Sequence, residues 1–398
     1  ASSGGTHTGV ANFGQDSTFA GATTAGGNSD ANGIGDFAYA PPSGYLALCT
    51  ANLPTPTIVD GSEHFNTVLY TGNSGTNAIT GVGFQPDFVW AKSRTTAFPP
   101  ELYDVIRGQN RMYSSATDAD AIGSITSFDS DGFTHTSGSI GTNASGDSIV
   151  AWNWKAGGTA VSNTAGSITS QVSANVDAGF SIVSFTCGSG VTSGTVGHGL
   201  GVQPQLIIGK TRNHAVNWYV QTPLLAANLS GILDTTSAWY DPGYNHWNDT
   251  HPTNTVFSVG GYMAGHADLT SPSTKICYCF ANVDGYSKVG SYIGNGSTDG
   301  PFVYTGFRPA WIMWKRTDSS TGGEWVIQDT TRREFNPVNV SLYPNLSNAE
   351  ATGETFRVQD TLSNGFKLRS SAAQCNASGG NYIYLAFAEN PFKYANAR

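Results

Sequence analysis

The stretch SAWYDPGYNHWNDTHPTN, residues 237–254, holds the densest group of side chains that could do chemistry. Tyr and Trp concentrate at interfaces, so the stretch favours packing within the domain or a subunit contact. Glycan contact is the main alternative, because aromatic faces can stack on sugar rings and Asp and Asn side chains can hydrogen-bond to sugar hydroxyls. Metal binding or catalysis is the remaining alternative. The candidate residues are Trp239, Tyr240, Tyr244, His246, Trp247 and Asp249.

Recognised catalytic patterns are missing from the rest of the sequence. It contains no G-x-S-x-G, no H-E-x-x-H and no G-x-x-x-x-G-K-[ST]. DSDG at 129–132 and ATDADA at 116–121 loosely resemble calcium loops. We interpret the first as a hairpin turn and the second as a solvated loop. The sequence therefore predicts no catalytic residues, no metal and no cofactor.

One ten-residue motif occurs three times in the sequence, with variations. GFQPDFVWAK at 83–92, GVQPQLIIGK at 201–210 and GFRPAWIMWK at 306–315 align on their prolines. Bulky residues alternate after each proline, which is typical of a strand that begins at a proline. A lysine stands six residues after each proline, at Lys92, Lys210 and Lys315. We interpret these lysines as protection of strand edges against stray pairing.

Other short motifs recur at similar distances after the three prolines. Gly132, Gly261 and Gly365 each stand in a two-residue turn before an aromatic residue, and such turns favour a type I′ hairpin. Each repeat then closes on a similar strand, IVAWNW, ICYCFAN or IYLAFAE, which we align on Ala151, Cys279 and Ala386. In this alignment Cys279 is a buried core residue. We expect Cys277 and Cys279 not to bond to each other, because alternate strand residues have poor disulfide geometry.

The composition agrees with strands and turns. Charged residues make up only 12% of the 398 residues, and 49 are glycine. Gly, Ser, Thr and Asn favour turns over helices. We predict an all-β chain of three tandem antiparallel β-sandwiches, jelly-roll-like, on an irregular N-terminal arm. The predicted ranges are 1–60 for the arm, then 61–160, 161–288 and 289–398 for the repeats.

Charge and hydropathy exclude several classes of function. The net charge of -9 argues against nucleic-acid binding, which needs a basic face. No apolar run reaches the roughly 18 residues of a membrane span, so we expect no membrane insertion. The opening ASSGGTHTGV lacks the pattern of a signal peptide.

The arm resembles the closing segment of SPRY-type, concanavalin-like domains in bacteriophage structural proteins. The residues that carry this resemblance are NFGQ at 12–15 and YAPPSG at 39–44, which leads into LCTANLP at 48–54. SFDSDGF, AWNWKAGG and the ending YLAFAENPFKYANAR resemble repeat domains of large virion proteins of marine phages. Most of the SPRY-like domain has no counterpart here, and the family brings no catalytic motif.

The resemblance implies a structural protein at the virion surface, of the tail-fibre or spike type, with host glycan contact. The alternatives are a capsid-surface decoration, a glycan-binding lectin or extracellular filament subunit, and a fibre-borne depolymerase. Few charges and many aromatics also predict a homo-oligomer, most simply a trimer, in which residues 1–45 cross to a neighbour. Other virion proteins are further expected partners.

Overall fold

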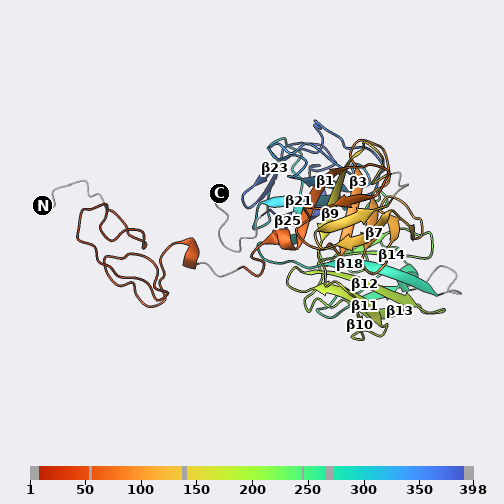
Figure 1. Ribbon diagram of the computed structural model, residues 1–398, viewed down its shortest axis with the longest axis horizontal. Coiled ribbons are helices and arrows are strands. Elements are labelled where there is room, and N and C mark those ends of the chain that lie inside the picture. The colour runs from red at the N-terminus through yellow and green to blue at the C-terminus, as the bar shows by residue number, and fades with distance from the viewer. Residues whose placement is uncertain (1–8, 53–55, 137–140, 244–245, 265–271, 390–398) are drawn as a thin grey trace. The chain divides into compact units, whose positions relative to one another are not determined.

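The structure is a computed structural model that describes residues 9–52, 56–136, 141–243, 246–264 and 272–389. The chain forms two compact units (Figure 1). Residues 9–52 are called the N-terminal unit and residues 56–389 the body. Within these residues the only α-helix is the four-residue α1 (Gly261–Ala264), accompanied by the 3-10 turns η1 (Thr50–Asn52) and η2 (Gly61–Glu63). The all-β, antiparallel prediction is confirmed.

The N-terminal unit is organised by carboxylates more than by strands. Asp30 accepts hydrogen bonds from the backbone nitrogens of Asn32, Ile34 and Ala47 at 2.8–2.9 Å. The Asn52 side chain donates a fourth bond at 2.6 Å. Burial raises the pKa of Asp30, but these donors outweigh burial and lower the pKa to about 2. A buried carboxylate thus takes the place of a hydrophobic core.

The first repeat holds a six-stranded sheet, in the order β1-β9-β3-β4-β5-β6, and a three-stranded sheet, β2-β8-β7. Its strands are β1 (Phe65–Thr71), β2 (Asn77–Ile79), β3 (Phe88–Ser93), β4 (Glu101–Asp104), β5 (Asn110–Tyr113), β6 (Ala121–Ile122), β7 (Ile125–Asp129), β8 (Gly132–His135) and β9 (Ser148–Trp154).

The second repeat holds a seven-stranded sheet, in the order β10-β11-β12-β18-β14-β15-β16, and the pair β13-β17. Its strands are β10 (Val161–Asn163), β11 (Ser170–Asn175), β12 (Phe180–Cys187), β13 (Ser193–Gly197), β14 (Leu206–Thr211), β15 (Tyr219–Gln221), β16 (Gly231–Ile232), β17 (Val256–Gly260) and β18 (Ser273–Phe280).

The third repeat holds a four-stranded sheet, β19-β25-β21-β22, and a three-stranded sheet, β20-β24-β23. Its strands are β19 (Ser287–Ile293), β20 (Phe302–Tyr304), β21 (Pro309–Arg316), β22 (Val326–Asp329), β23 (Gln359–Leu362), β24 (Gly365–Leu368) and β25 (Asn381–Ala388). The four strands β1-β9-β3-β4 therefore recur as β12-β18-β14-β15 and as β19-β25-β21-β22.

The proline-led phrases form equivalent strands, as predicted. Two residues after each proline, Phe88, Leu206 and Trp311 pair with Trp154, Phe280 and Phe387. This register also corrects the alignment of the closing strands. Asn153, and not Ala151, is the equivalent of Cys279 and Ala386. The sequence alignment slipped by two residues because AWNW offers two tryptophans of the same alternating pattern.

The turn prediction is wrong in the second repeat. Gly261 begins α1, and β17 pairs with β13 alone, so there is no hairpin at that place. The aromatic residue that matches Phe133 and Phe366 is Phe257, because all three lie opposite the same position of the small sheet. A Gly-Gly pair suits many backbone turns, and here it leads into a helical one.

The other two hairpins exist, one residue earlier than predicted. Asp129 pairs with Gly132 and Leu362 with Gly365, so the turn residues are Ser130-Asp131 and Ser363-Asn364. Gly132 and Gly365 are needed for close approach, since a Cβ would lie 1.9 Å from the Ile79 carbonyl oxygen and 2.1 Å from that of Val303.

The three large sheets share one hydrophobic core, which we call the shared core. Residues of all three repeats meet in it, and each repeat also has a smaller core between its own two sheets. Rings from different repeats are in contact, with centroids 4.3 Å apart for Phe88 and Tyr278 and 5.6 Å apart for Trp154 and Trp311. β3 and β14 are consequently buried along their whole length.

The interpretation of the three lysines as edge protection is wrong. Lys92, Lys210 and Lys315 are fully buried on central strands. Each ammonium donates to a backbone carbonyl of another repeat, and these carbonyls belong to Ser347, Thr117 and Thr236 respectively. The lysine of the first repeat thus binds the third repeat, that of the second binds the first, and that of the third binds the second.

The same cyclic pattern continues two residues later. The carbonyls of Arg94, Arg212 and Thr317 accept backbone hydrogen bonds from Glu350, Asp120 and Trp239 at 2.7–2.8 Å. Each donor stands three residues after the carbonyl that the lysine binds. The three contacts between repeats are therefore built alike.

Buried ion pairs reinforce two of the three junctions. Asp104 pairs with Arg107 at 2.5 Å and accepts the Tyr278 hydroxyl of the second repeat at 2.8 Å. The equivalent pair in the third repeat, Asp329 with Arg332, accepts the Trp152 indole N–H of the first repeat at 3.0 Å.

The third junction is apolar at the same positions. The strand register places Thr222 and Leu225 of the second repeat where the other repeats have the aspartate and the arginine. Leu385 of the third repeat stands where the others have Tyr278 and Trp152. Leu225 packs on the shared core, where Leu385 is also buried.

These junctions predict the cost of breaking an ion pair. Arg107→Leu leaves the Asp104 carboxylate buried without its cation, and we expect it to lower the free energy of unfolding by about 3–5 kcal/mol. The triple variant D104T/R107L/Y278L copies the apolar junction and should recover most of that loss. Urea unfolding measures both, and equal destabilisation of the two variants would contradict this account.

The buried lysines predict a pH dependence. Burial lowers the pKa of Lys92 and Lys210 to about 8 and that of Lys315 to about 7. In the unfolded chain lysine titrates near pH ~10.4, so between about pH 7 and pH ~10.4 the unfolded state holds more protons, and these lysines should make stability rise with pH across that range. Thermal unfolding at several pH values measures the rise. It should disappear in K92M/K210M/K315M, and a rise of the same size there would assign it to other groups.

Candidate functional site

The candidate residues of the stretch 237–254 do not come together as one surface. Trp239 lies in the shared core, whereas Trp247 lies in the core of the second repeat. His246 is also buried, its ring 3.9 Å from that of Tyr219, and burial lowers its pKa to about 4. Tyr240 and Asp249 are exposed. Tyr244 lies outside the described residues. Three of the six candidates are thus core residues.

The acidic phrases have structural partners. Asp131 accepts the backbone N–H groups of Gly81 and Gly83 and so fixes the hairpin to a neighbouring loop. Asp120 pairs with Arg212 of the second repeat at 2.9 Å. Among the described residues, no group of three or more His, Cys, Asp or Glu side chains could hold a metal.

The cysteine predictions hold. Cys277 and Cys279 are free thiols, and both are fully buried. Burial raises the pKa of Cys279 to about 12 and raises that of Cys277 as well. Such thiols are chemically inert and serve as small apolar side chains.

A buried polar network in the first repeat was not predicted. His135 lies between Ser124 and Tyr70, with ring nitrogens 2.9 Å from the Ser124 hydroxyl and 3.0 Å from the Tyr70 hydroxyl. The Glu101 carboxylate accepts from Tyr103 and Thr142. No sequence signal marked this group, because its six members are spread over residues 70–142. At the positions of His135 the other repeats hold Val259 and Leu368, and the ring is fully buried, so substrate has no access to it.

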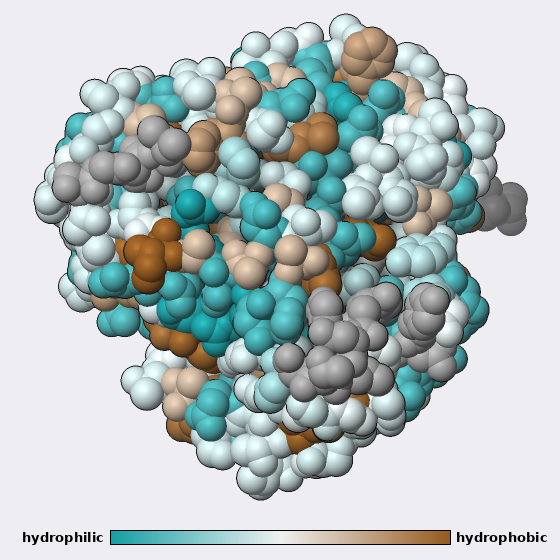
Figure 2. All heavy atoms as spheres, turned by 90° about the vertical axis from the view of Figure 1, so that its right-hand side faces the viewer, coloured by the Kyte–Doolittle hydropathy of each residue, from teal (hydrophilic) through white to brown (hydrophobic). Residues whose placement is uncertain are grey.

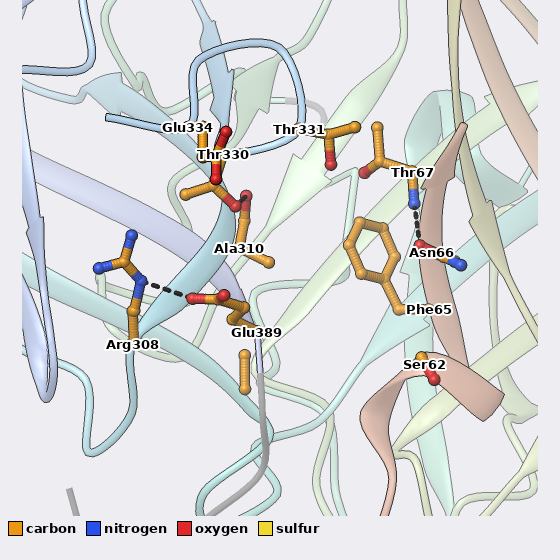
Figure 3. A pocket seen from close by; sticks show the side chains of 11 residues that line it. Ser62, Phe65, Asn66, Thr67, Arg308, Ala310, Thr330, Thr331, Glu334 and Glu389 are labelled. Atoms are coloured by element: carbon orange, nitrogen blue, oxygen red, sulfur yellow. Dashed lines mark hydrogen bonds and ion pairs between the residues drawn. The ribbon is translucent and has the colours of Figure 1, made fainter. Parts of the chain in front are cut away.

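The body also has a pocket of about 240 Å³ between its first and third repeats (Figure 3). Here the start of the body meets its end, and we call the place the seam. One wall is the β1 edge, with Asn66 and Thr67, and the other is formed by the ends of β21, β22 and β25. The remaining lining residues are Ser62, Phe65, Arg308, Ala310, Thr330, Thr331, Glu334, Ala388 and Glu389.

The polar groups of the seam pocket face each other from the two repeats. Arg308 pairs with Glu389 at 2.5 Å, and both remain partly exposed. Glu334 and Thr331 are exposed, and Thr330 is half-buried. Asn66 holds its amide in place by donating to the Val82 carbonyl at 3.1 Å. Phe65 is mostly covered, since its ring stacks on Phe387 with centroids 4.9 Å apart. The pocket thus offers hydroxyls, carboxylates and a guanidinium.

Ion pairs also join the first and third repeats outside the pocket lining. Arg94 of the first repeat makes two hydrogen bonds to Glu350 of the third at 2.8 and 3.0 Å. Glu350 also accepts from Arg332 at 2.9 Å. Burial raises the pKa of Glu350, but the two guanidinium groups outweigh burial and lower it. First and last repeat are therefore joined by ionised groups.

Fold and pocket together define an all-β protein of repeated sandwiches with a polar pocket and no recognised catalytic centre in the part described. The chain belongs to the family described as a domain of unknown function (DUF7483), which matches residues 60–391 and so spans all three repeats. No curated protein and no solved structure matches the chain. No helix among the described residues is long and apolar enough to cross a membrane.

The difference in burial between Trp247 and Tyr240 predicts unequal effects of two substitutions. Trp247→Ala empties a large space in the core of the second repeat and should cost about 3–5 kcal/mol of unfolding free energy. Tyr240→Ala, at the surface of the same stretch, should cost less than about 1 kcal/mol. Chemical denaturation compares them, and a Trp247→Ala protein as stable as Tyr240→Ala would refute the packing role.

Proposed function

We propose that the chain is a structural protein of a bacteriophage virion, of the tail-fibre or spike type, exposed at the particle surface and in contact with host glycan. The observation that supports this best is the shared core. It joins three sandwiches into one body by packing and by buried bonds between repeats, which is what a rigid scaffold for presenting loops requires. The resemblance of the arm and of the repeat phrases to phage virion proteins supports the same proposal.

The surface of the body suits presentation more than further stacking. On the face seen in Figure 2, apolar residues lie in small separate groups among hydrophilic ones. The large aromatic side chains are mostly inside, including Trp152, Trp154, Trp311, Trp314 and Trp325. The apolar faces of the three sandwiches, which we expected to lie between subunits, pack on one another within one chain.

We propose that the N-terminal unit mediates self-assembly. Phe13, Tyr39, Tyr45 and Leu48 are between 59% and 87% exposed there, which is unusual for side chains of this size. Phe13, Tyr39 and Tyr45 also line a hollow of about 360 Å³ in that unit. We propose that these side chains gain cover from neighbouring copies, in a homo-oligomer that a trimer would satisfy, or from other virion proteins.

The virion role predicts a location. Gold-labelled antibodies against residues 56–389, applied to intact particles of the phage that encodes the chain, should mark tail appendages. Labelling spread over the capsid would identify a decoration protein instead. Virions that carry no label and no peptides of the chain would refute the virion role altogether.

The assembly role predicts a mass. In light scattering at micromolar concentration, the full chain should run as an oligomer, and a variant lacking residues 1–55 should run as a monomer. The variant with Phe13, Tyr39 and Tyr45 changed to Ser serves as the matched control with unchanged length. A full chain that is monomeric, or an oligomer that survives both changes, would contradict assembly through this unit.

A further inference from the structure

We propose that the seam pocket binds a neutral saccharide unit through hydrogen bonds to its hydroxyls. This inference rests on the proposed glycan contact and names the place and the chemistry of that contact. It also moves the contact away from residues 239–249, where half of the candidates are core residues.

The strongest argument comes from the three junctions, which are built alike and so serve as controls for one another. Thr330 and Thr331 follow Asp329 at the end of β22. The equivalent residues of the first repeat, Val105 and Ile106, follow Asp104 and pack against the shared core. The second repeat has Pro223 and Leu224 there. The other two repeats thus fold with apolar side chains at this place. At the seam the Thr330 hydroxyl donates to the Ala310 carbonyl at 3.4 Å, and Thr331 is exposed.

Two neighbouring positions carry a charge at the seam and none in the other two repeats. Arg308 stands where the other repeats have Gln85 and Gln203, each one residue before the shared proline. Glu389 stands where they have Ala156 and Asn282. At the seam these two residues form the ion pair beside the pocket. Four residues thus give this hollow hydroxyls and charges that the other two junctions lack at the same positions, while the lysine and backbone contacts between repeats remain as in the others.

The lining suits hydroxyls better than ions. A sugar hydroxyl both donates and accepts, and the pocket offers acceptors on Glu389 and Glu334, donors on Arg308, and both on the Thr331 hydroxyl. Because the Thr330 hydroxyl donates to the Ala310 carbonyl, it is left as an acceptor. Because Arg308 is paired with Glu389 and Glu334 adds a negative charge, an anionic ligand is repelled. A volume of about 240 Å³ is small for a drug-sized ligand and suits a single ring.

The test uses saturation-transfer NMR on the full chain with glucose, galactose, mannose and N-acetylglucosamine, and with glucuronate and N-acetylneuraminate as anionic probes. We expect transfer to at least one neutral sugar and none to the anions. T330V/T331I installs the side-chain classes of the first repeat, and it should weaken binding about tenfold or more, because hydrogen bonds are lost and the space is filled. Thr331→Ile alone is the fallback if the double variant does not fold, which its melting temperature reports.

Tyr240→Ala is the control for the loop predicted from sequence, and it should bind as the unchanged chain does. Binding that is lost in Tyr240→Ala and kept in T330V/T331I would overturn the seam site while leaving glycan contact standing. Transfer to the anions alone, or to none of the six sugars, would overturn the saccharide proposal. The virion role is judged separately, by the particle labelling, and neither result decides the other.

Discussion

The structure depends on one constraint, the burial of both faces of the central strands. One face of each large sheet packs within its own sandwich and the other in the shared core. Burying apolar area is the main favourable term in folding, and three sheets that share a core bury more of it than three separate sandwiches. This packing costs free energy at the strand ends, because polar groups there lose their hydrogen bonds to water. Lys92, Lys210 and Lys315 meet it by donating to carbonyls of another repeat.

The junctions show two solutions to one packing problem. Where Asp104 and Asp329 pair with an arginine, a Tyr hydroxyl or Trp N–H from another repeat completes the group. Where the second repeat has Thr222, the facing residue is the apolar Leu385. Buried ion pairs add little net stability over an apolar equivalent, but a mismatched pairing leaves a charge unsatisfied.

Function belongs to the places where the repeats differ, because the shared architecture itself carries no chemistry. The first repeat has a polar network around His135 that is sealed from solvent, and it contributes to packing. The seam has hydroxyls and an ion pair around a hollow that opens to solvent. Burial separates the two: the same residue types form structure when enclosed and a binding site when exposed.

The sequence by itself determined the all-β class, the three proline-led strands and the buried free thiols. These follow from alternation, turn chemistry and spacing, which are local properties. It could not distinguish Gly261 from a hairpin glycine, and it assigned the lysines to exposed edges because their partners, such as Ser347 for Lys92, lie in another repeat. The tertiary structure alone decided that Trp239 and Trp247 belong to cores and that Thr330 and Thr331 line a pocket with Asn66. Burial and long-range contact depend on how sheets pack, and no local pattern records which residue of a distant repeat will be the neighbour.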